Sequence, residues 1–144
     1  MNWYKTSQYS SLMYRGSDGP EDLWVKNFPG VFLNPDPLSA RRDGPNVYGY
    51  RIMPGRYFSP DILEPSQKEC MVVSDYARKN GVKRISTCKK LLNAFLLNPT
   101  ESWVKYLSEL GYLGFIEYDR VFLFDTANAQ YIGKYDFDKK VISK

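Results

Sequence analysis

The sequence predicts an α+β fold, with a twisted, mostly antiparallel sheet that is split in two and a three-helix segment packed on it. Short runs rich in aromatic and aliphatic residues, which are typical of strands, occupy both ends of the chain. Between them, residues 66–110 carry apolar residues at helical spacing, with capping residues at the boundaries. The clearest strand pattern, 112–125, follows directly and is expected to form a central hairpin.

The length and composition indicate one ordinary globular domain. A chain of 144 residues is long enough to build its own hydrophobic core, so we expect a single domain over 1–144. Hydrophobic residues make up 43% and charged residues 25% of the chain. Since no apolar run approaches the roughly 18 residues of a membrane-spanning helix and no secretion signal is visible, we expect a cytoplasmic protein without a membrane partner.

The charge pattern argues against a nucleic-acid-binding arm. The net charge is +4, and the basic residues are scattered in pairs such as Arg41-Arg42 and Lys89-Lys90. No run of five or more basic residues occurs, so nucleic acid is not indicated as a partner. A mild positive field favours anionic ligands in general, including the phosphates of a dinucleotide.

Histidine is missing from the sequence, and cysteine occurs only at Cys70 and Cys88. This excludes histidine-based metal sites, histidine general bases and Ser–His or Cys–His dyads, so we expect no metal site. Both cysteines fall on the inward stripes of predicted helices. We therefore expect both cysteines to be reduced and buried, and to pack as small apolar side chains without a disulfide between them.

The first third of the chain carries short strand patterns that are ended by turn residues. Leu12–Gly16 is followed by a turn cluster, and its only charge, Arg15, lies near its end. This arginine is either a solvated edge residue or an anion-binding group on a rigid strand. The other elements expected here are a strand over 30–33, a short helix over 37–42 capped by Asp36, a strand over 47–53 and a brief pairing segment at Tyr57-Phe58.

Three helices are predicted next, and their inward stripes carry no polar residue. The first begins at the capping box Ser66–Glu69 and ends at Asn80-Gly81. The second carries the stripe 88–96 and is stopped by Pro99, while the third runs from a cap at Thr100 to Gly111. We assign these helices a structural role.

Two carboxylates, Glu117 and Asp119, stand at the far end of the first strand of the expected hairpin. Because they are two residues apart, they share one face for as long as the strand continues. The pair either performs chemistry or marks the place where the hairpin meets water. A last strand is expected over 131–137, and the charged tail 138–144 is expected to fray.

Three pieces of the sequence stand in an order that resembles the ADP-ribosyltransferase-like superfamily, especially its small phage and mobile-element members. In that family a Leu-Tyr-(His or Arg)-Gly strand comes first, a Phe-Phe-Ser-Thr-Asp-Pro-like segment follows, and Gly-Tyr-Asp-Gly and Val-Phe-Asp strands close the chain. The matching pieces here are Tyr14-Arg15-Gly16, the segment 30–37 with Ser39-Ala40 and the strand 47–53 after it, and Leu110-Gly111-Tyr112 with two strands ending at Phe124-Asp125. The resemblance implies NAD as the cofactor.

The resemblance also implies which residues hold NAD. Arg15 matches the basic residue that contacts the ribose or a phosphate of NAD. Asn34 stands where the second motif usually has Ser or Thr, which is a departure from the pattern. Aromatic residues of the third strand are candidates for stacking on nicotinamide, and the sequence does not choose between them. The cofactor-binding residues implied in this way are Tyr14, Arg15, Gly16, Asn34, Tyr48 and Tyr50.

The catalytic acid of the family stabilises the positive charge that develops at the ribose carbon. In many members this acid opens the last strand, where the present chain has Arg120. Some small phage inhibitors instead place an acid at the end of the preceding strand, which matches Asp119, with Glu117 nearby. The resemblance therefore implies Asp119 as the catalytic residue and Glu117 as the second choice.

These observations leave three classes of function open. The first is an NAD-dependent mono-ADP-ribosyltransferase that modifies a protein target, such as a phage factor acting on a host protein in the host cytoplasm. The second is a catalytically inactive binding protein or host-defence inhibitor on the same scaffold, which Arg120 and Asn34 favour. The third is an unrelated α+β module, including a nucleic-acid binder. Neither the target protein nor the modified residue type is readable from the sequence.

Overall fold

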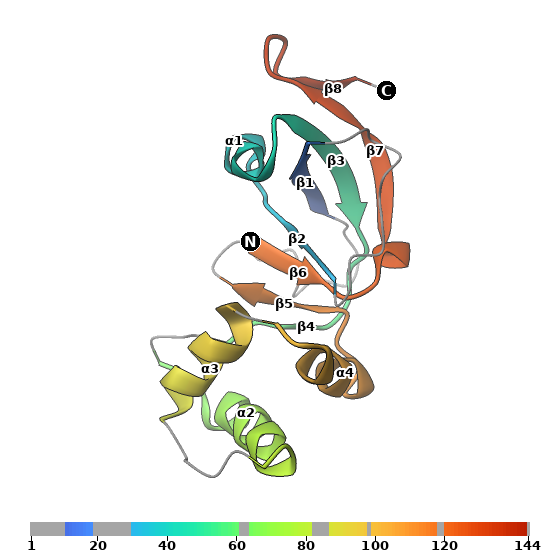
Figure 1. Cartoon of the computed structure of the whole chain (residues 1–144). Helices are drawn as coiled ribbons and strands as arrows, with labels where there is room; N and C mark the ends of the chain where they lie inside the picture. Colours follow the sequence, from blue (N-terminus) through green and yellow to red (C-terminus); the bar gives the residue numbers. More distant parts are fainter. Residues whose placement is uncertain are drawn as a thin grey trace.

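The structure is a computed structural model that describes residues 11–18, 30–60, 64–81, 87–97, 99–117 and 120–143. Its fold class is α+β, as predicted, with strands and helices grouped in separate layers (Figure 1). None of the helices in these ranges is long and apolar enough to cross a membrane. In chain order the elements are β1 (Ser11–Ser17), β2 (Val31–Leu33), α1 (Pro37–Ala40), η2 (Arg41–Asp43), β3 (Asn46–Ile52), β4 (Tyr57–Phe58), α2 (Gln67–Lys79), α3 (Cys88–Leu97), α4 (Glu101–Glu109), β5 (Gly114–Glu117), β6 (Arg120–Leu123), η3 (Thr126–Asn128), β7 (Ala129–Asp136) and β8 (Val141–Ser143).

The strands of the described ranges form two four-stranded sheets, which confirms the predicted split. Sheet A has the order β1-β3-β7-β8 and is antiparallel throughout. Sheet B has the order β2-β6-β5-β4, and only its β4–β5 pair is parallel. The predicted central hairpin is confirmed, because β5 and β6 pair with each other and are the two inner strands of sheet B.

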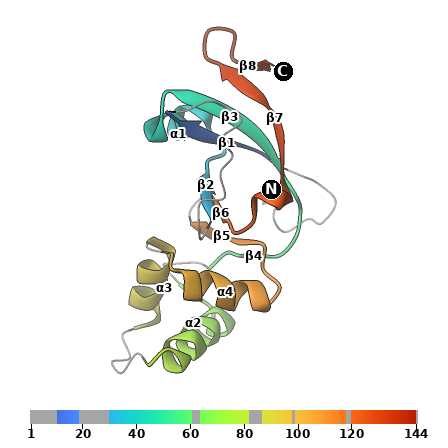
Figure 2. The ribbon, with the colours of Figure 1, turned by 45° about the vertical axis from the view of Figure 1, so that its right-hand side comes forward.

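Sheet B lies between sheet A and the helices, so the molecule has three layers. Figures 1 and 2 show α2, α3 and α4 on one side of sheet B and the longer strands of sheet A on the other. Alternating residues of β5 therefore enter two different cores. Phe115 packs with Trp103 and the helices, whereas Ile116 packs with Met13 and Tyr50 between the two sheets.

The helices begin at the caps that the sequence predicts. The Ser66 hydroxyl accepts from the Glu69 N–H, and the Glu69 carboxylate accepts from the Ser66 N–H. The Thr100 hydroxyl accepts from the Trp103 N–H at the start of α4. Trp103 is fully buried at the centre of the helical core, in contact with Phe58 and Tyr76.

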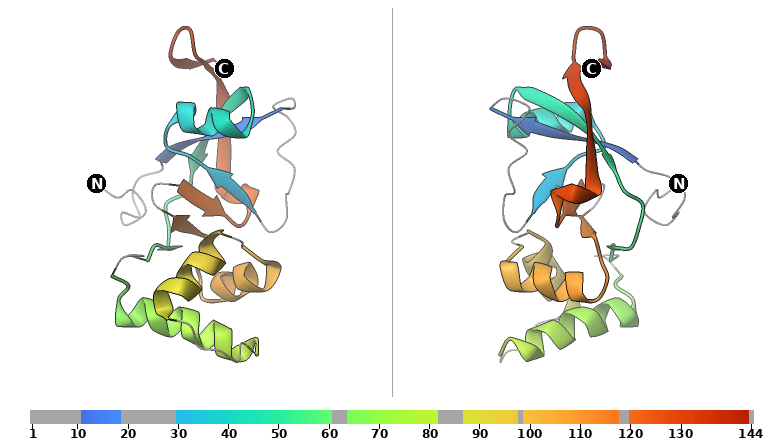
Figure 3. Two further views of the ribbon diagram at one scale, coloured as in Figure 1. Left: turned by 60° about the vertical axis from the view of Figure 1, so that its left-hand side comes forward. Right: turned by 90° about the vertical axis from the view of Figure 1, so that its right-hand side faces the viewer.

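Two expectations are wrong. Cys70 of α2 and Cys88 of α3 form a disulfide, with their Cα atoms 5.6 Å apart, whereas we expected reduced residues. The helical stripes correctly place both cysteines toward the protein, but periodicity does not tell which inward residues of two helices meet. The tail does not simply fray, because β8 pairs with β7 and the two strands extend beyond the rest of sheet A (Figure 3).

Candidate functional site

The inner face of sheet A, which contacts sheet B, brings several of the predicted residues together. Arg15 of β1 is directly opposite Tyr48 of β3, and Tyr48 is directly opposite Lys134 of β7. Residues directly opposite each other in antiparallel strands share a face. Tyr50 lies on the same face two residues along β3, and both tyrosines are almost fully buried in the core between the sheets. The structure therefore places Arg15, Tyr48 and Tyr50 on one face of sheet A.

Two further residues of this face were missed by the sequence reasoning. Lys134 places a second cation on the other side of Tyr48, and Tyr131 is opposite Tyr50. The Tyr131 ring is 43% exposed and lies 5.5 Å from the Tyr50 ring. A strand over 131–137 was expected, but its partner was unknown, and the register shift between Gly49 and Tyr50 also alters which residues face inward.

The row Arg15–Tyr48–Lys134 has the residue types that bind a phosphorylated, flat ligand. A guanidinium group forms strong paired hydrogen bonds to phosphate oxygens, and a lysine ammonium adds a second positive charge. Aromatic rings such as that of Tyr131 offer a face for stacking against a flat heterocycle. Tyr48 and Tyr50 are buried in the core, so the side chains of this face that a ligand could reach are those of Arg15, Lys134 and Tyr131.

Tyr14 and Gly16 do not lie on this face. Tyr14 is opposite Gly49, on the outer side of sheet A, and its ring meets that of Tyr135 at 5.6 Å. Burial, followed by the nearby Tyr135 and Asp36, raises the pKa of Tyr14. A side chain at Gly16 would overlap the Ala40 carbonyl group of α1, so this glycine allows α1 to pack on β1.

Asn34 has a main-chain role in the structure. The Tyr14 N–H donates to the Asn34 carbonyl oxygen at 2.7 Å, and the Asn34 N–H donates to the Tyr14 carbonyl oxygen at 2.8 Å. This bridge ties the chain after β2 to the edge strand β1 and so links sheet B to sheet A. Because only backbone atoms take part, the bridge does not depend on the amide side chain.

Glu117 faces the helices. It is two residues after Phe115, and strand alternation puts it on the Phe115 side of sheet B. It is buried, with 7% exposure, and its carboxylate lies 3.4 Å from the Arg120 guanidinium. The same guanidinium stacks on the Phe32 ring at 3.9 Å. Glu117 is thus held in an ion pair within the β5–β6 hairpin.

Arg15 and Glu117 are therefore not brought together, because sheet B lies between them. Arg15 looks toward the core between the two sheets, while Glu117 looks toward the helical layer. Asp119 lies outside the described residues, so its placement stays a prediction.

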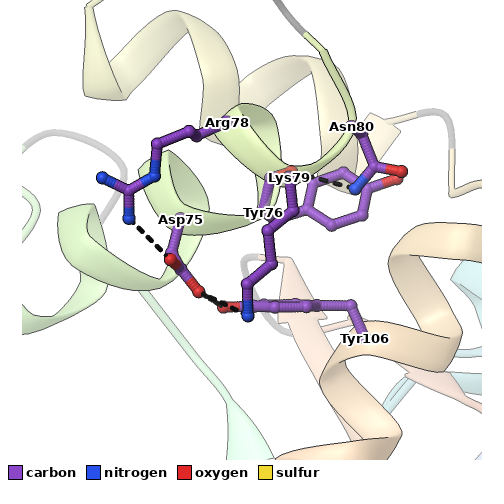
Figure 4. A network of polar contacts seen from close by, with 6 residues as sticks. All are labelled: Asp75, Tyr76, Arg78, Lys79, Asn80 and Tyr106. Carbon is purple, nitrogen blue, oxygen red and sulfur yellow. Dashed lines mark hydrogen bonds and ion pairs between the residues drawn. The ribbon is translucent and has the colours of Figure 1, made fainter.

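A separate polar cluster joins α2 to α4 (Figure 4). The Asp75 carboxylate accepts from the Arg78 guanidinium at 2.7 Å and from the Tyr106 hydroxyl at 2.8 Å, and the Lys79 ammonium lies 3.3 Å away. The hydrogen bond from Arg78, together with those from Tyr106 and Lys79, lowers the pKa of Asp75 to about 2. Burial and the Asp75 hydrogen bond raise the pKa of Tyr106 to about 12. The spacing of Asp75 from Arg78 and Lys79 is that of ion pairs on a helix, but no pattern in the sequence points to Tyr106, which lies on a different helix.

Comparison with known proteins identifies a structural neighbour. No family model matches the sequence, and no curated protein matches it either. A solved structure described as the crystal structure of an anti-CRISPR protein aligns with a TM-score of 0.51 and 14% sequence identity. The alignment covers 88% of this chain and 98% of that chain. At this identity the likeness concerns the fold, over nearly the whole of the neighbour.

Proposed function

We propose that this chain is an NAD-dependent mono-ADP-ribosyltransferase that modifies a protein, acting as a phage factor against a host defence in the host cytoplasm. The observation that carries the proposal is the row Arg15–Tyr48–Lys134 on the inner face of sheet A, with Tyr131 beside it. The anti-CRISPR neighbour supports the host-defence part of the proposal, since its fold covers most of this chain.

The proposed reaction breaks the bond between the nicotinamide nitrogen and the ribose carbon and forms a bond from that carbon to a nucleophile of the target, which loses its proton. Arg15 and Lys134 would hold the phosphates, and Tyr131, whose ring is exposed, would orient the flat ring. Positive charge develops at the ribose carbon, so a carboxylate is needed there. We assign this role to Asp119, because Glu117 is paired with Arg120 on the other side of sheet B.

The second candidate function is a binding protein that inhibits its target without chemistry. It is favoured by the Glu117–Arg120 ion pair, in which a cation stands at the usual position of the catalytic acid and neutralises the nearest described carboxylate. The anti-CRISPR neighbour is equally compatible with this function, because an inhibitor needs only a binding surface.

Isothermal titration with NAD tests the shared binding step. Arg15→Ala should weaken NAD binding about ten- to a hundred-fold, since a charge-assisted phosphate contact is lost. Arg51→Ala is the matched control, because Arg51 is exposed on β3 but belongs to the outer face. Equal losses in both variants, or no binding by the wild type at millimolar NAD, would reject the assigned site and leave the non-enzymatic function.

Labelling distinguishes the two candidates. The chain is incubated with biotin-labelled NAD and a cell lysate, and ADP-ribose adducts are identified by blotting and mass spectrometry. Asp119→Ala should lower the transfer rate about a hundred- to a thousand-fold while the circular dichroism spectrum stays unchanged. Labelling that survives in the double variant Asp119→Ala/Glu117→Ala would refute the catalytic assignment. Binding of NAD without labelling by the wild type would favour the inhibitor.

A further inference from the structure

A trough follows the exposed side of α2, and its other side is formed by α4 in one part and by residues 55–59 and Tyr112 in the other. One part is a groove of about 480 Å³ lined mainly by apolar surface, which includes Met71, Val72, Tyr106 and Leu110. A second hollow of about 590 Å³ continues it toward Arg56 and Tyr112 of the neighbouring segments. Lys68 and Val72 line both parts, so the two hollows are continuous along α2. From Ser66 to Arg78 the helix extends about 18 Å at 1.5 Å per residue.

The floor of this trough exposes large apolar side chains. Met71 is 65% exposed and Leu110 is 41% exposed, and they lie on α2 and at the end of α4, respectively. Isolated exposed apolar residues are ordinary on protein surfaces, but two in one groove form a patch. Met71 suits a recognition surface because its side chain is flexible and polarisable.

The charges around the trough are mostly positive once internal pairs are considered. The cations Arg56, Lys68 and Arg78 line it, together with the two acids Glu69 and Asp75. Glu69 is committed to capping the start of α2, and Asp75 is shared between Arg78, Lys79 and Tyr106. Arg78 and Asp75 balance each other, so Arg56 and Lys68 are set against Glu69 alone and the lining keeps a small excess of positive charge.

The trough is also fixed in shape. The Tyr106 hydroxyl donates to the Asp75 carboxylate (Figure 4). The hydroxyl groups of Tyr76 and Ser102 are also hydrogen-bonded, so each helix is tied to the other at two points. Arg56 donates to the Leu110 carbonyl oxygen at 3.2 Å and stacks on Tyr112, which positions the far end. A surface that is already rigid loses little conformational entropy when a partner binds.

We infer that this α2–α4 trough is a docking surface for an acidic segment of a protein partner, with apolar side chains that cover Met71 and Leu110 and carboxylates that meet Lys68 and Arg56. The trough lies on the helical layer, away from the inner face of sheet A. It serves partner recognition whether or not the chain modifies that partner, so the inference stands apart from the NAD chemistry.

Peptide display tests the inference although the partner is unidentified. The full chain is used to select from a library of random peptides, in parallel with the variant Met71→Asp/Leu110→Asp. The wild type should enrich peptides that combine Asp or Glu with Leu, Met or Phe. The variant should bind these peptides at least about tenfold more weakly, because a central apolar contact has been removed. Enriched peptides without acidic residues, or equal binding by the variant, would overturn the inference.

Matched variants locate the contact. Leu38→Asp changes a similarly exposed residue of α1, and Lys90→Glu reverses a charge on the exposed side of α3, so neither should alter peptide binding. Lys68→Glu, within the trough, should weaken peptide binding. The variant Met71→Asp/Leu110→Asp should bind NAD as the wild type does in the titration, which separates this inference from the proposed enzyme. If the wild type forms a dimer and Met71→Asp loses it, the trough binds a second copy of the chain. If the chain binds a single-stranded oligonucleotide through Lys68 and does not bind acidic peptides, the trough binds nucleic acid. Either result refutes the proposal.

Discussion

Glu117 and Arg120 form an ion pair between the paired ends of β5 and β6, with 3.4 Å between the carboxylate and the guanidinium. Arg120 is held in place by its contact with the Phe32 ring. Because Glu117 is buried, its negative charge depends on this one cation among the described residues. Arg120 therefore has a structural task, which is to compensate a buried carboxylate.

Arg120→Ala should destabilise the fold, because it leaves the Glu117 carboxylate buried without its cation. The expected loss is about 1–3 kcal/mol in the free energy of unfolding, since the partner keeps its desolvation cost when its counterpart is removed. Urea titration followed by tryptophan fluorescence measures it. The double variant Arg120→Ala/Glu117→Gln should recover part of the loss. A single variant as stable as the wild type would show that solvent already compensates Glu117.

Gly16→Ala should also destabilise the protein, for a steric reason. An added methyl group would overlap the Ala40 carbonyl group, so α1 would have to move off β1 at a cost of about 1–3 kcal/mol. Gly81→Ala is a useful comparison, because Gly81 has open space around it but a φ of +70°. Its cost should be nearer 1 kcal/mol. Thermal unfolding of both variants checks the order, and a smaller shift for Gly16→Ala would contradict the packing argument.

The sequence predicted most of the fold because its local signals agree with its packing. The capping residues Ser66 and Thr100 begin helices where expected, and the apolar run 112–125 forms the central hairpin. The last strand pair was only half predicted. The strand over 131–137 was expected, but β8, which contains Val141 and Ile142, was not. The tail is short and charged, and only its pairing with β7 makes it a strand.

The candidate site was predictable only in part, since its residues meet through pairing across the sheet. Arg15 and Tyr48 were both named from the sequence, and the register places them opposite each other. Lys134 joins Arg15 and Tyr48 because β7 lies next to β3. Lys134 is far along the chain from both residues, and no local pattern reports such a neighbour. Glu117 could not be assigned to a face before it was known that both sides of sheet B are covered.

The disulfide between Cys70 and Cys88 should make stability depend on the redox state. The bond closes a loop with a sequence separation of 18. Loop-closure entropy then gives about 3 kcal/mol of stabilisation, because the crosslink restricts the unfolded chain. Addition of a reductant should lower the urea midpoint of the wild type. The variant Cys70→Ser/Cys88→Ser should show the lower midpoint at once and no response to reductant, and a wild type that ignores reductant would contradict the prediction.

Asp75 should make the α2–α4 contact sensitive to acid. Its pKa in the folded protein is lowered to about 2, first by the hydrogen bond from Arg78 and then by those from Tyr106 and Lys79, whereas an ordinary aspartate titrates near 3.8. A carboxyl group with a lowered folded-state pKa stabilises the protein above its unfolded pKa, and this contribution is lost as the pH falls through the folded value. Asp75→Asn should therefore be less stable than the wild type at pH 7, and the difference should shrink between about pH 4 and pH 2.

Glu109→Gln, at an exposed position of α4, is the control for a general effect of removing a negative charge. Urea midpoints measured for the three proteins over this pH range give the comparison. A difference between Asp75→Asn and the wild type that is constant from pH 7 to pH 2 would show that the Asp75 ion pairs do not stabilise the fold.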